Sequence, residues 1–404
     1  MHTKKLGILG SGSAGIQSVC YFLANLPKKW EISLIYNPAI PSLGIGESTN
    51  GTFVHTIEAG LDFNFVEDLP SLDGTTKFAT RYENWRPNHI YGPLIQGNCA
   101  MHFDTFKLSA FAIPRLHKIW KDRFCEIQGN VTQINNQGDS VIVSVDGQDL
   151  EYDYIMDCRG TPKTFDDYWT PDDFAVNHGL IHNSPGDGTN WACTVHRATV
   201  DGWMFQVPLT TRISNGYLFN NTITDVDQAR ENFSKEINVP IDQLDNIEYK
   251  FRPYYAKQIL ENRVVKNGNN ALFFEPIFAN ALWNYDMINK FFKDFLIGTF
   301  TEDDVNQKYI WHVAKLRDMI HFKYHGGSQY KTKFWDQLVK TSTQSLQNSP
   351  VFNEACYVMK KFNKINNMSF VNNNPELRDK FWWLYPPDGL NKVDQVFGYN
   401  YFKV

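Results

Sequence analysis

The chain has 404 residues, of which 42% are hydrophobic and 15% aromatic, so it can form one large domain or two to three ordinary ones. A net charge of −5 excludes the basic surface that nucleic-acid binding requires, and no run of about 18 apolar residues is present to cross a membrane. Glycines from Gly10 onward interrupt the first apolar run too early for a signal peptide. The six cysteines are scattered and form no C-x-x-C pair. We therefore expect a cytoplasmic protein with reduced thiols, no membrane or nucleic-acid partner and no metal site.

The N-terminal segment has the order strand, glycine-rich turn, helix, strand. An apolar run at residues 5–9 leads into Gly10-Ser-Gly12-Ser13-Ala14-Gly15, and helical spacing and a second strand at residues 31–36 follow. In such a unit Gly10 permits a tight turn, Gly12 lets backbone amides approach a pyrophosphate, and Gly15 lets the helix pack on the strand. The alternative is a plain strand-to-helix turn. The strand before and the helix after the glycines favour nucleotide binding.

Later segments alternate between strands and helices without an internal repeat. Residues 40–100 are interrupted by Gly, Pro and Asn and predict loops and short elements, and a helix is predicted at about 105–121. Two strands joined by a turn at Asp146-Gly147 are predicted at 140–145 and 150–156. Residues 200–224 alternate like strands, whereas the chain beyond about 283 is helical in pattern. We expect these pieces to interleave in one body.

Two further predicted strands also end in glycine turns. Asp157-Cys158-Arg159-Gly160 closes one strand, and the segment from Gly268 to Pro276 follows a strand at 263–265. Three unrelated turns would be the plain explanation. Several strand ends that meet at one ligand suit the long FAD molecule better than a nicotinamide cofactor alone. The acidic residue that normally holds the ribose is missing after the second strand, so Asn37 and Glu47 are the candidates for that contact.

Three motifs with a particular spacing resemble the flavin-dependent halogenases. They are Gly44-Ile-Gly46-Glu47-Ser48-Thr49, then Thr76-Lys77-Phe78 with Trp85 eight residues after the lysine, and Gly202-Trp203-Met-Phe205-Gln-Val207-Pro208-Leu209. The resemblance extends from residue 5 to about 340 and leaves the tail unmatched. The chain is shorter than most members, as a short phage-encoded member would be.

The resemblance implies an α/β fold, namely the Rossmann-like FAD-binding fold of flavin monooxygenases with an interleaved substrate-binding region and a helical C-terminal part. Residues 1–165 would mainly bind FAD, with loops in 40–100 facing the active site, and 166–255 would form a substrate-binding sheet. Residues 256–300 would return to the FAD domain with the halide motif, and 301–404 would cover the substrate. The implied FAD contacts are Gly10, Gly12, Ser13, Ala14, Gly15, Gly46, Glu47, Ser48, Asp157, Gly160, Gly268 and Pro276.

The implied chemistry uses FADH2 from a separate flavin reductase, O2 and a halide to halogenate an electron-rich aromatic substrate. Trp203, Phe205 and Pro208 would separate the flavin from that substrate, because bulky apolar rings exclude water from a reactive oxidant. Without the resemblance, the same pattern is a core strand with two aromatics. Lys77 would be the catalytic residue. It would either donate a hydrogen bond to hypohalous acid as an ammonium or form a haloamine as a neutral amine; without the resemblance it would be an ordinary solvated lysine.

The halide motif departs from the tryptophan halogenases, which read E-P-L-E-S-T-G where this chain reads Glu275-Pro-Ile-Phe278-Ala-Asn280-Ala281. Phe278 replaces a catalytic Glu and is similar to the phenol and pyrrole branch, so a self-activated ring is favoured over free tryptophan. Asn280 and the backbone amide of Ala281 are the candidate halide ligands, and the change favours bromide or iodide over chloride.

Several features remain open at this point. His321 and His325, like His178 and His182, lie four residues apart but lack the Glu of a zinc-protease helix, so we interpret them as ordinary helix-face or loop histidines, with His178 in a loop. The aromatic segment 381–387 is a candidate for substrate cover or for an oligomer contact. A flavin hydroxylase on a similar fold and a catalytically silent FAD-binding protein are the rival functions.

Overall fold

The computed structural model describes residues 3–42, 44, 47–85, 89–91, 100–186, 188, 191–277 and 279–361. Gly46, Phe278 and the aromatic segment 381–387 lie outside the described residues. No helix in the described ranges is long and apolar enough to span a membrane.

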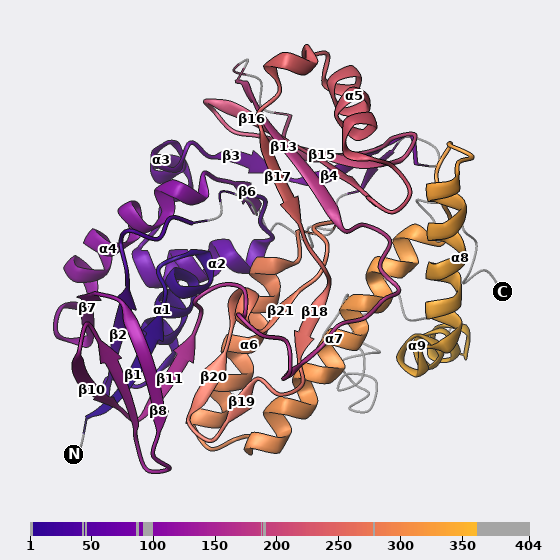
Figure 1. The fold of residues 1–404 in the computed structure, drawn as a ribbon. Helices are drawn as coiled ribbons and strands as arrows, with labels where there is room; N and C mark the ends of the chain where they lie inside the picture. Colours follow the sequence, from indigo (N-terminus) through magenta and orange to yellow (C-terminus); the bar gives the residue numbers. More distant parts are fainter. Residues whose placement is uncertain are drawn as a thin grey trace.

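A six-stranded sheet near the N-terminus carries the glycine turns (Figure 1). Its strand order is β19 (Leu260–Glu261), β20 (Val264–Lys266), β11 (Tyr154–Asp157), β1 (Lys4–Leu9), β2 (Trp30–Tyr36) and β7 (Phe124–Gln128). All neighbours are parallel except β19 and β20. Parallel strands place their carboxyl ends at one edge, so the turns after β1, β11 and β20 lie together.

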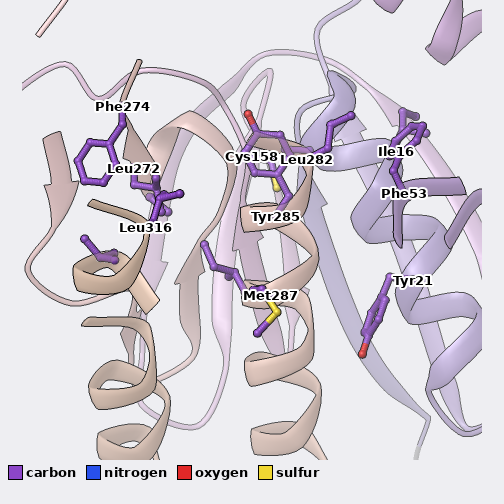
Figure 2. Close-up of a cluster of buried hydrophobic side chains, with 14 of the residues drawn as sticks. Ile16, Tyr21, Phe53, Cys158, Leu272, Phe274, Leu282, Tyr285, Met287 and Leu316 are labelled. Atoms are coloured by element: carbon purple, nitrogen blue, oxygen red, sulfur yellow. The ribbon is translucent and has the colours of Figure 1, made fainter. Parts of the chain in front are cut away.

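Helix α1 (Ser13–Asn25) follows the first glycine turn and packs against three other helices. These are α2 (Gly51–Leu61), α4 (Thr105–Trp120) and α6 (Ala281–Leu296). Figure 2 shows how α6 joins the core: Leu282, Tyr285 and Met287 lie between Leu316 of α7 (Glu302–Tyr324) and Ile16 of α1. Residues far apart in the sequence thus share one apolar core.

A second sheet of seven strands forms the other layer of the molecule. Its strand order is β17 (Ile247–Lys250), β13 (His178–Pro185), β16 (Arg212–Phe219), β15 (Gly202–Pro208), β14 (Cys193–Ala198), β4 (Ala79–Glu83) and β5 (His89–Tyr91). Next to it β3 (Thr75–Lys77) pairs with β6 (Ala100–His102). The sheet therefore combines residues 79–91 with residues 178–250.

The remaining elements flank these two sheets. The strands are β8 (Val131–Asn136), β9 (Val141–Val145) and β10 (Gln148–Tyr152) in one small sheet and β12 (Tyr168–Trp169), β18 (Tyr254–Ala256) and β21 (Leu272–Phe273) in another. The helices are α3 (Phe65–Asp68), α5 (Val226–Ile237), α8 (Lys333–Asn348) and α9 (Pro350–Lys361). Helices α7, α8 and α9 pack on one another and form the helical C-terminal part (Figure 1).

Residues 40–100, predicted as loops and short elements, contain α2, which begins where the Asn50 side chain accepts a hydrogen bond from the Phe53 amide (3.3 Å) and so caps the helix. Two other predictions about elements were wrong. The strand predicted at 150–156 is two strands, since the chain leaves the β9–β10 hairpin at Asp153 and enters the six-stranded sheet as β11. His178, expected in a loop, begins β13.

Candidate active site

Three glycine turns lie against one another at the carboxyl edge of the six-stranded sheet. A Cβ on Gly10, whose φ is +99°, would lie 3.0 Å from the carbonyl oxygen of Cys158, and a Cβ on Gly268 would lie 2.8 Å from the Cβ of Ala14. A Cβ on Gly15 would lie 1.7 Å from the carbonyl oxygen of Gly10. Larger residues at these positions would push the three turns apart.

Gly12 differs from its neighbours because the space beside it is open. No heavy atom lies within 4 Å of a Cβ built there, and the space beside Gly160 is open as well. Gly12 also stands at the N-terminal cap of α1, whose cap makes no side-chain hydrogen bond. Open space in front of uncapped amides is what a pyrophosphate needs, so these residues fit the phosphate part of FAD.

The polar side chains considered as FAD contacts already have partners within the protein. Arg159 donates from its guanidinium to both carboxylate oxygens of Asp157, at 2.8 Å each. Asn37 accepts a hydrogen bond from the amide of Ala39 (2.9 Å). Glu47, which is 3% exposed, is paired with Arg212. Burial raises the pKa of Glu47 to about 7, and Arg212 opposes that rise.

Lys77 is buried at the end of β3 and is 4% exposed. Its Nζ donates to Ser48 Oγ and to the carbonyl oxygen of Thr49, at 2.8 Å each. Burial lowers the pKa of Lys77 to about 8, and the Cys193 thiol opposes that shift. The structure thus places Lys77 in the protein interior, which is unusual for a lysine without a function.

Ser48 lies between Lys77 and the second sheet. Its hydroxyl lies 2.9 Å from Thr194 Oγ1 and accepts from Lys77. Both motifs that contain these residues, the one around Ser48 and the one around Lys77, therefore meet in space. The hydroxyl of Ser48, predicted to contact FAD, is engaged by protein groups in this structure.

The three predicted barrier residues are buried on β15, and Trp203 and Phe205 share one face of it. Trp203 is fully buried and Phe205 is 9% exposed, and their ring centroids are 6.5 Å apart. The ring of Phe205 lies over Gly216 on the neighbouring strand, where a Cβ would come within 2.2 Å of it. His196 on β14 lies 5.2 Å from the Trp203 ring and 5.4 Å from the Tyr82 ring. Aromatic rings therefore surround His196, on which the charge of the buried lysine acts.

A second buried lysine, which the charge of Lys77 affects, was not identified from the sequence. Lys323 of α7 is 2% exposed, donates to the hydroxyl of Tyr82, and has its pKa held well below the usual value by burial and by the charge of Lys77. Glu275 is buried beside it, and burial raises the pKa of Glu275 to about 8 while Tyr324 and Lys323 oppose the rise. Nothing in the helical pattern around Lys323 distinguishes it from a surface lysine.

The predicted halide residues lie at the start of α6. Asn280 precedes the helix, donates to the carbonyl oxygen of Glu275 (3.3 Å) and accepts from Asn284 (3.1 Å). Pro276 accepts from the amide of Ala279, whose φ is +50°. Ala281 is the first residue of α6, and no side chain caps the helix there. The first amides of a helix attract anions, so a halide fits this position.

The four histidines discussed above have protein partners, and the ring of His325 stacks on that of Phe322 with centroids 5.3 Å apart. His178 Nε2 lies 2.9 Å from Glu248, His182 Nδ1 lies 3.3 Å from Asp245, and His321 Nδ1 lies 3.2 Å from Ser342. In the described part of the chain, no group of three or more His, Cys, Asp or Glu side chains could hold a metal ion.

Comparison with known proteins identifies the family. The tryptophan halogenase family model matches residues 5–124 and 93–372. Tryptophan 6-halogenase ThaL of Streptomyces albogriseolus is 20% identical over 417 residues, which cover 82% of this chain and 78% of that protein.

Solved structures of halogenases share the fold. The tryptophan halogenase of Shewanella frigidimarina superposes with a TM-score of 0.76 at 18% identity and covers 88% of this chain and 83% of its own. BrvH, a flavin-dependent halogenase of Brevundimonas, superposes with a TM-score of 0.71 at 15% identity and covers 99% and 96%. The predicted fold, a Rossmann-like FAD-binding α/β fold with a helical C-terminal part, is confirmed. Since the family model spans most of the sequence, the chain belongs to the tryptophan halogenase family and is a flavin-dependent halogenase.

Proposed function

We propose that this enzyme halogenates an electron-rich aromatic ring of the phenol, pyrrole or indole type, and that Lys77 delivers the halogen. The observation that carries the proposal is the burial of Lys77, whose Nζ donates to two hydrogen-bond acceptors. The charge of Lys77 acts on His196, whose ring lies 5.2 Å from that of Trp203, so this histidine connects the lysine with the barrier strand.

Members of the family use FADH2, O2 and a halide, and a separate flavin reductase supplies the reduced flavin. When bound, reduced FAD supplies the oxygen chemistry that converts halide into hypohalous acid. Residues of this chain would hold the cofactor: the backbone at Gly12 and Ser13 would bind the pyrophosphate, with open space beside Gly12 and Gly160, while Gly10, Gly15 and Gly268 keep the turns close. We assign FAD binding to residues 1–165 and 256–300, substrate binding to 166–255 and substrate cover to 301–404.

Lys77 is proposed to act as an ammonium. A carbonyl oxygen such as that of Thr49 can only accept a hydrogen bond, so this contact favours the protonated amine. Within the described residues Lys77 makes two hydrogen bonds, and an ammonium has three N–H groups. The third can donate to the oxygen of hypohalous acid and make the halogen more electrophilic, while Trp203 and Phe205 exclude water.

The substrate class follows from the side chain at position 278. Curated relatives are named tryptophan 6-halogenase and tryptophan 7-halogenase. This chain has Phe278 where those enzymes have a catalytic Glu, so a ring that activates itself is favoured, as a phenol is by ionising. Indoles are included as substrates because the curated relatives are named for tryptophan, which carries an indole ring.

The experiment is a panel of phenols, pyrroles, indoles and tryptophan, incubated with FAD, NADH, a flavin reductase and each halide, with products identified by mass. A halogenated product supports the proposal, whereas a hydroxylated product or none contradicts it. Lys77→Ala should oxidise reduced flavin nearly as the parent does but lose on the order of 10²-fold or more of the halogenated product. Halogenation by Lys77→Ala at the parental rate would contradict the role of Lys77.

A further inference from the structure

A chain of buried hydrogen bonds connects Lys77 with the end of the barrier strand. Lys77 Nζ donates to Ser48 Oγ (2.8 Å), which lies 2.9 Å from Thr194 Oγ1, which in turn lies 2.9 Å from His102 Nε2. On the other side of the ring, His102 Nδ1 lies 2.9 Å from Thr75 Oγ1. Thr75 then donates to the carbonyl oxygen of Pro208 at 2.6 Å, where β15 ends.

These residues are held together by backbone pairing of distant segments. Thr75 and Lys77 lie two residues apart on β3 and so point to the same face, and Thr75 is the strand partner of His102 on β6. Ser48 forms an isolated bridge with His102, and Thr194 lies on β14 of the second sheet. All members are less than a tenth exposed, so water does not replace the contacts between them.

The direction of the chain follows from its far end. The carbonyl of Pro208 can only accept, so the single hydroxyl proton of Thr75 points to it, and Thr75 must accept from His102 Nδ1. In a neutral ring the proton on Nδ1 leaves Nε2 as an acceptor, so Thr194 donates to Nε2. Burial and the charge of Lys77 hold the pKa of His102 well below its usual value, which keeps the ring neutral.

Because each hydroxyl has only one proton to donate, the direction of the remaining hydrogen bonds toward Lys77 follows as well. Thr194 has used its proton on His102, so it accepts from Ser48, and Ser48 in turn accepts from Lys77. A Ser48 hydroxyl that points away from Lys77 presents its lone pairs to Nζ. That arrangement stabilises the ammonium more than the neutral amine, because hydrogen bonds that a charged amine donates to an acceptor are the stronger ones.

We propose that His102 is a positioning residue that keeps Lys77 in the ammonium form, acting through Thr194 and Ser48. The proposal rests on the assignment of Lys77 as the residue that meets hypohalous acid. The chemistry of the reaction stays with Lys77, whereas His102, Thr194 and Thr75 set its charge and orientation.

Titratable groups on β6, β14 and α7 surround this chain of hydrogen bonds. Lys77 faces Cys193 and His196 on β14, His102 on β6 and Lys323 on α7. Lys323 and Lys77 repel each other when both are charged, the pKa of each histidine is held well below its usual value, and the Cys193 thiol supports the charge on Lys77. A change of one hydroxyl at Thr194 alters none of these charges, so its effect on Lys77 reports the hydrogen-bond chain alone.

The test measures the titration of Lys77 directly. Full-length protein labelled with ¹³C at the lysine side chains is titrated by NMR, and the Lys77 signal is the one that Lys77→Arg removes. Thr194→Val takes away the acceptor of Ser48, whose hydroxyl can then turn to donate to the amine. We expect the pKa of Lys77 to fall by about one unit, the effect of roughly one hydrogen bond to a charged group. Thr194→Ser, which keeps the hydroxyl, should restore the parental value.

A second readout is the pH profile of halogenated product, in which the limb that titrates Lys77 should move to lower pH in Thr194→Val and not in Thr194→Ser. If Thr194→Val does not fold, Thr75→Val removes the far anchor, lets His102 exchange its ring proton, and should lower the pKa of Lys77 in the same direction. An unchanged or raised pKa in a folded valine variant overturns the proposal. Failure of the proposed function is distinguished by Lys77→Ala, which would then halogenate at the parental rate whatever the titration shows.

Discussion

Lys77 is charged in a place where burial disfavours charge, and this makes its activity sensitive to pH. Burial lowers its pKa to about 8, so the ammonium predominates below that pH and the neutral amine above it. If the ammonium activates hypohalous acid, halogenated product should decline as pH rises through about 8, while oxidation of reduced flavin should not follow the same curve. Product that increases through this range would instead favour the haloamine.

The residues around Lys77 show what sequence reasoning can and cannot find. Lys77 was predicted because its motif and its interval to Trp85 resemble those of the flavin-dependent halogenases. The partners that set its charge come from segments as distant as Thr194, 146 residues from Ser48, and single Thr or His residues carry no pattern of their own. Lys323 was missed for the same reason, since only the fold brings α7 to Tyr82.

At the scale of single elements, the start of α1 gives a test of FAD binding. Gly12→Glu should weaken FAD binding by on the order of 10²-fold or more, because the carboxylate would occupy the phosphate position. Gly12 has an ordinary φ of −68° and open space beside it, so the variant should fold like the parent. Affinity is measured by flavin fluorescence, with Gly12→Gln as a control of the same size without charge. Equal affinity in the Glu variant and the parent would reject the assignment.

The start of α6 bears on the choice of halide. Bromide or iodide should give more product than chloride on the same substrate, because Asn280-Ala281 replaces the Thr-Gly pair and the larger anions are easier to oxidise. Competition between chloride and bromide, read by product mass, measures the preference. The double variant Asn280→Thr with Ala281→Gly should shift the ratio toward chloride. Chloride turnover equal to that of bromide in the parent would show that these residues do not select the halide.

Elements were predicted well where a local pattern decides them. The first strand, helix and strand were found because glycines mark the turn and apolar spacing marks the helix. Residues 40–100 were predicted only as loops and short elements, because Gly, Pro and Asn interrupt the pattern there, and the helix at 51–61 depends on the Asn50 side chain as its cap. Strands β10 and β11 were merged because one continuous β pattern does not show where the chain changes sheets.

At the scale of the whole molecule, the carboxylate of Asp173 connects the segment before β13 of the second sheet to helices α7 and α8. Asp173 precedes β13, and its Oδ2 lies 2.6 Å from both Arg317 on α7 and Ser345 on α8 and 3.1 Å from His321. Burial by itself would raise the pKa of Asp173, but His321, Arg317 and Ser345 together hold it well below its usual range. No local sequence pattern indicates these contacts, because the residues that make them lie up to 172 positions apart.

Asp173→Asn should therefore loosen the packing of α7 and α8 on the rest of the chain. Since the folded-state pKa is depressed, the stabilisation is present above the unfolded pKa of about 4 and is lost as pH falls toward the folded value. At neutral pH we expect a loss of about 1–3 kcal/mol, seen as a thermal midpoint lower by a few degrees. Asp172→Asn, a change at the exposed neighbouring position, is the matched control. The gap between the parent and Asp173→Asn should narrow below about pH 4; a gap independent of pH would show that charge at Asp173 does not hold these helices.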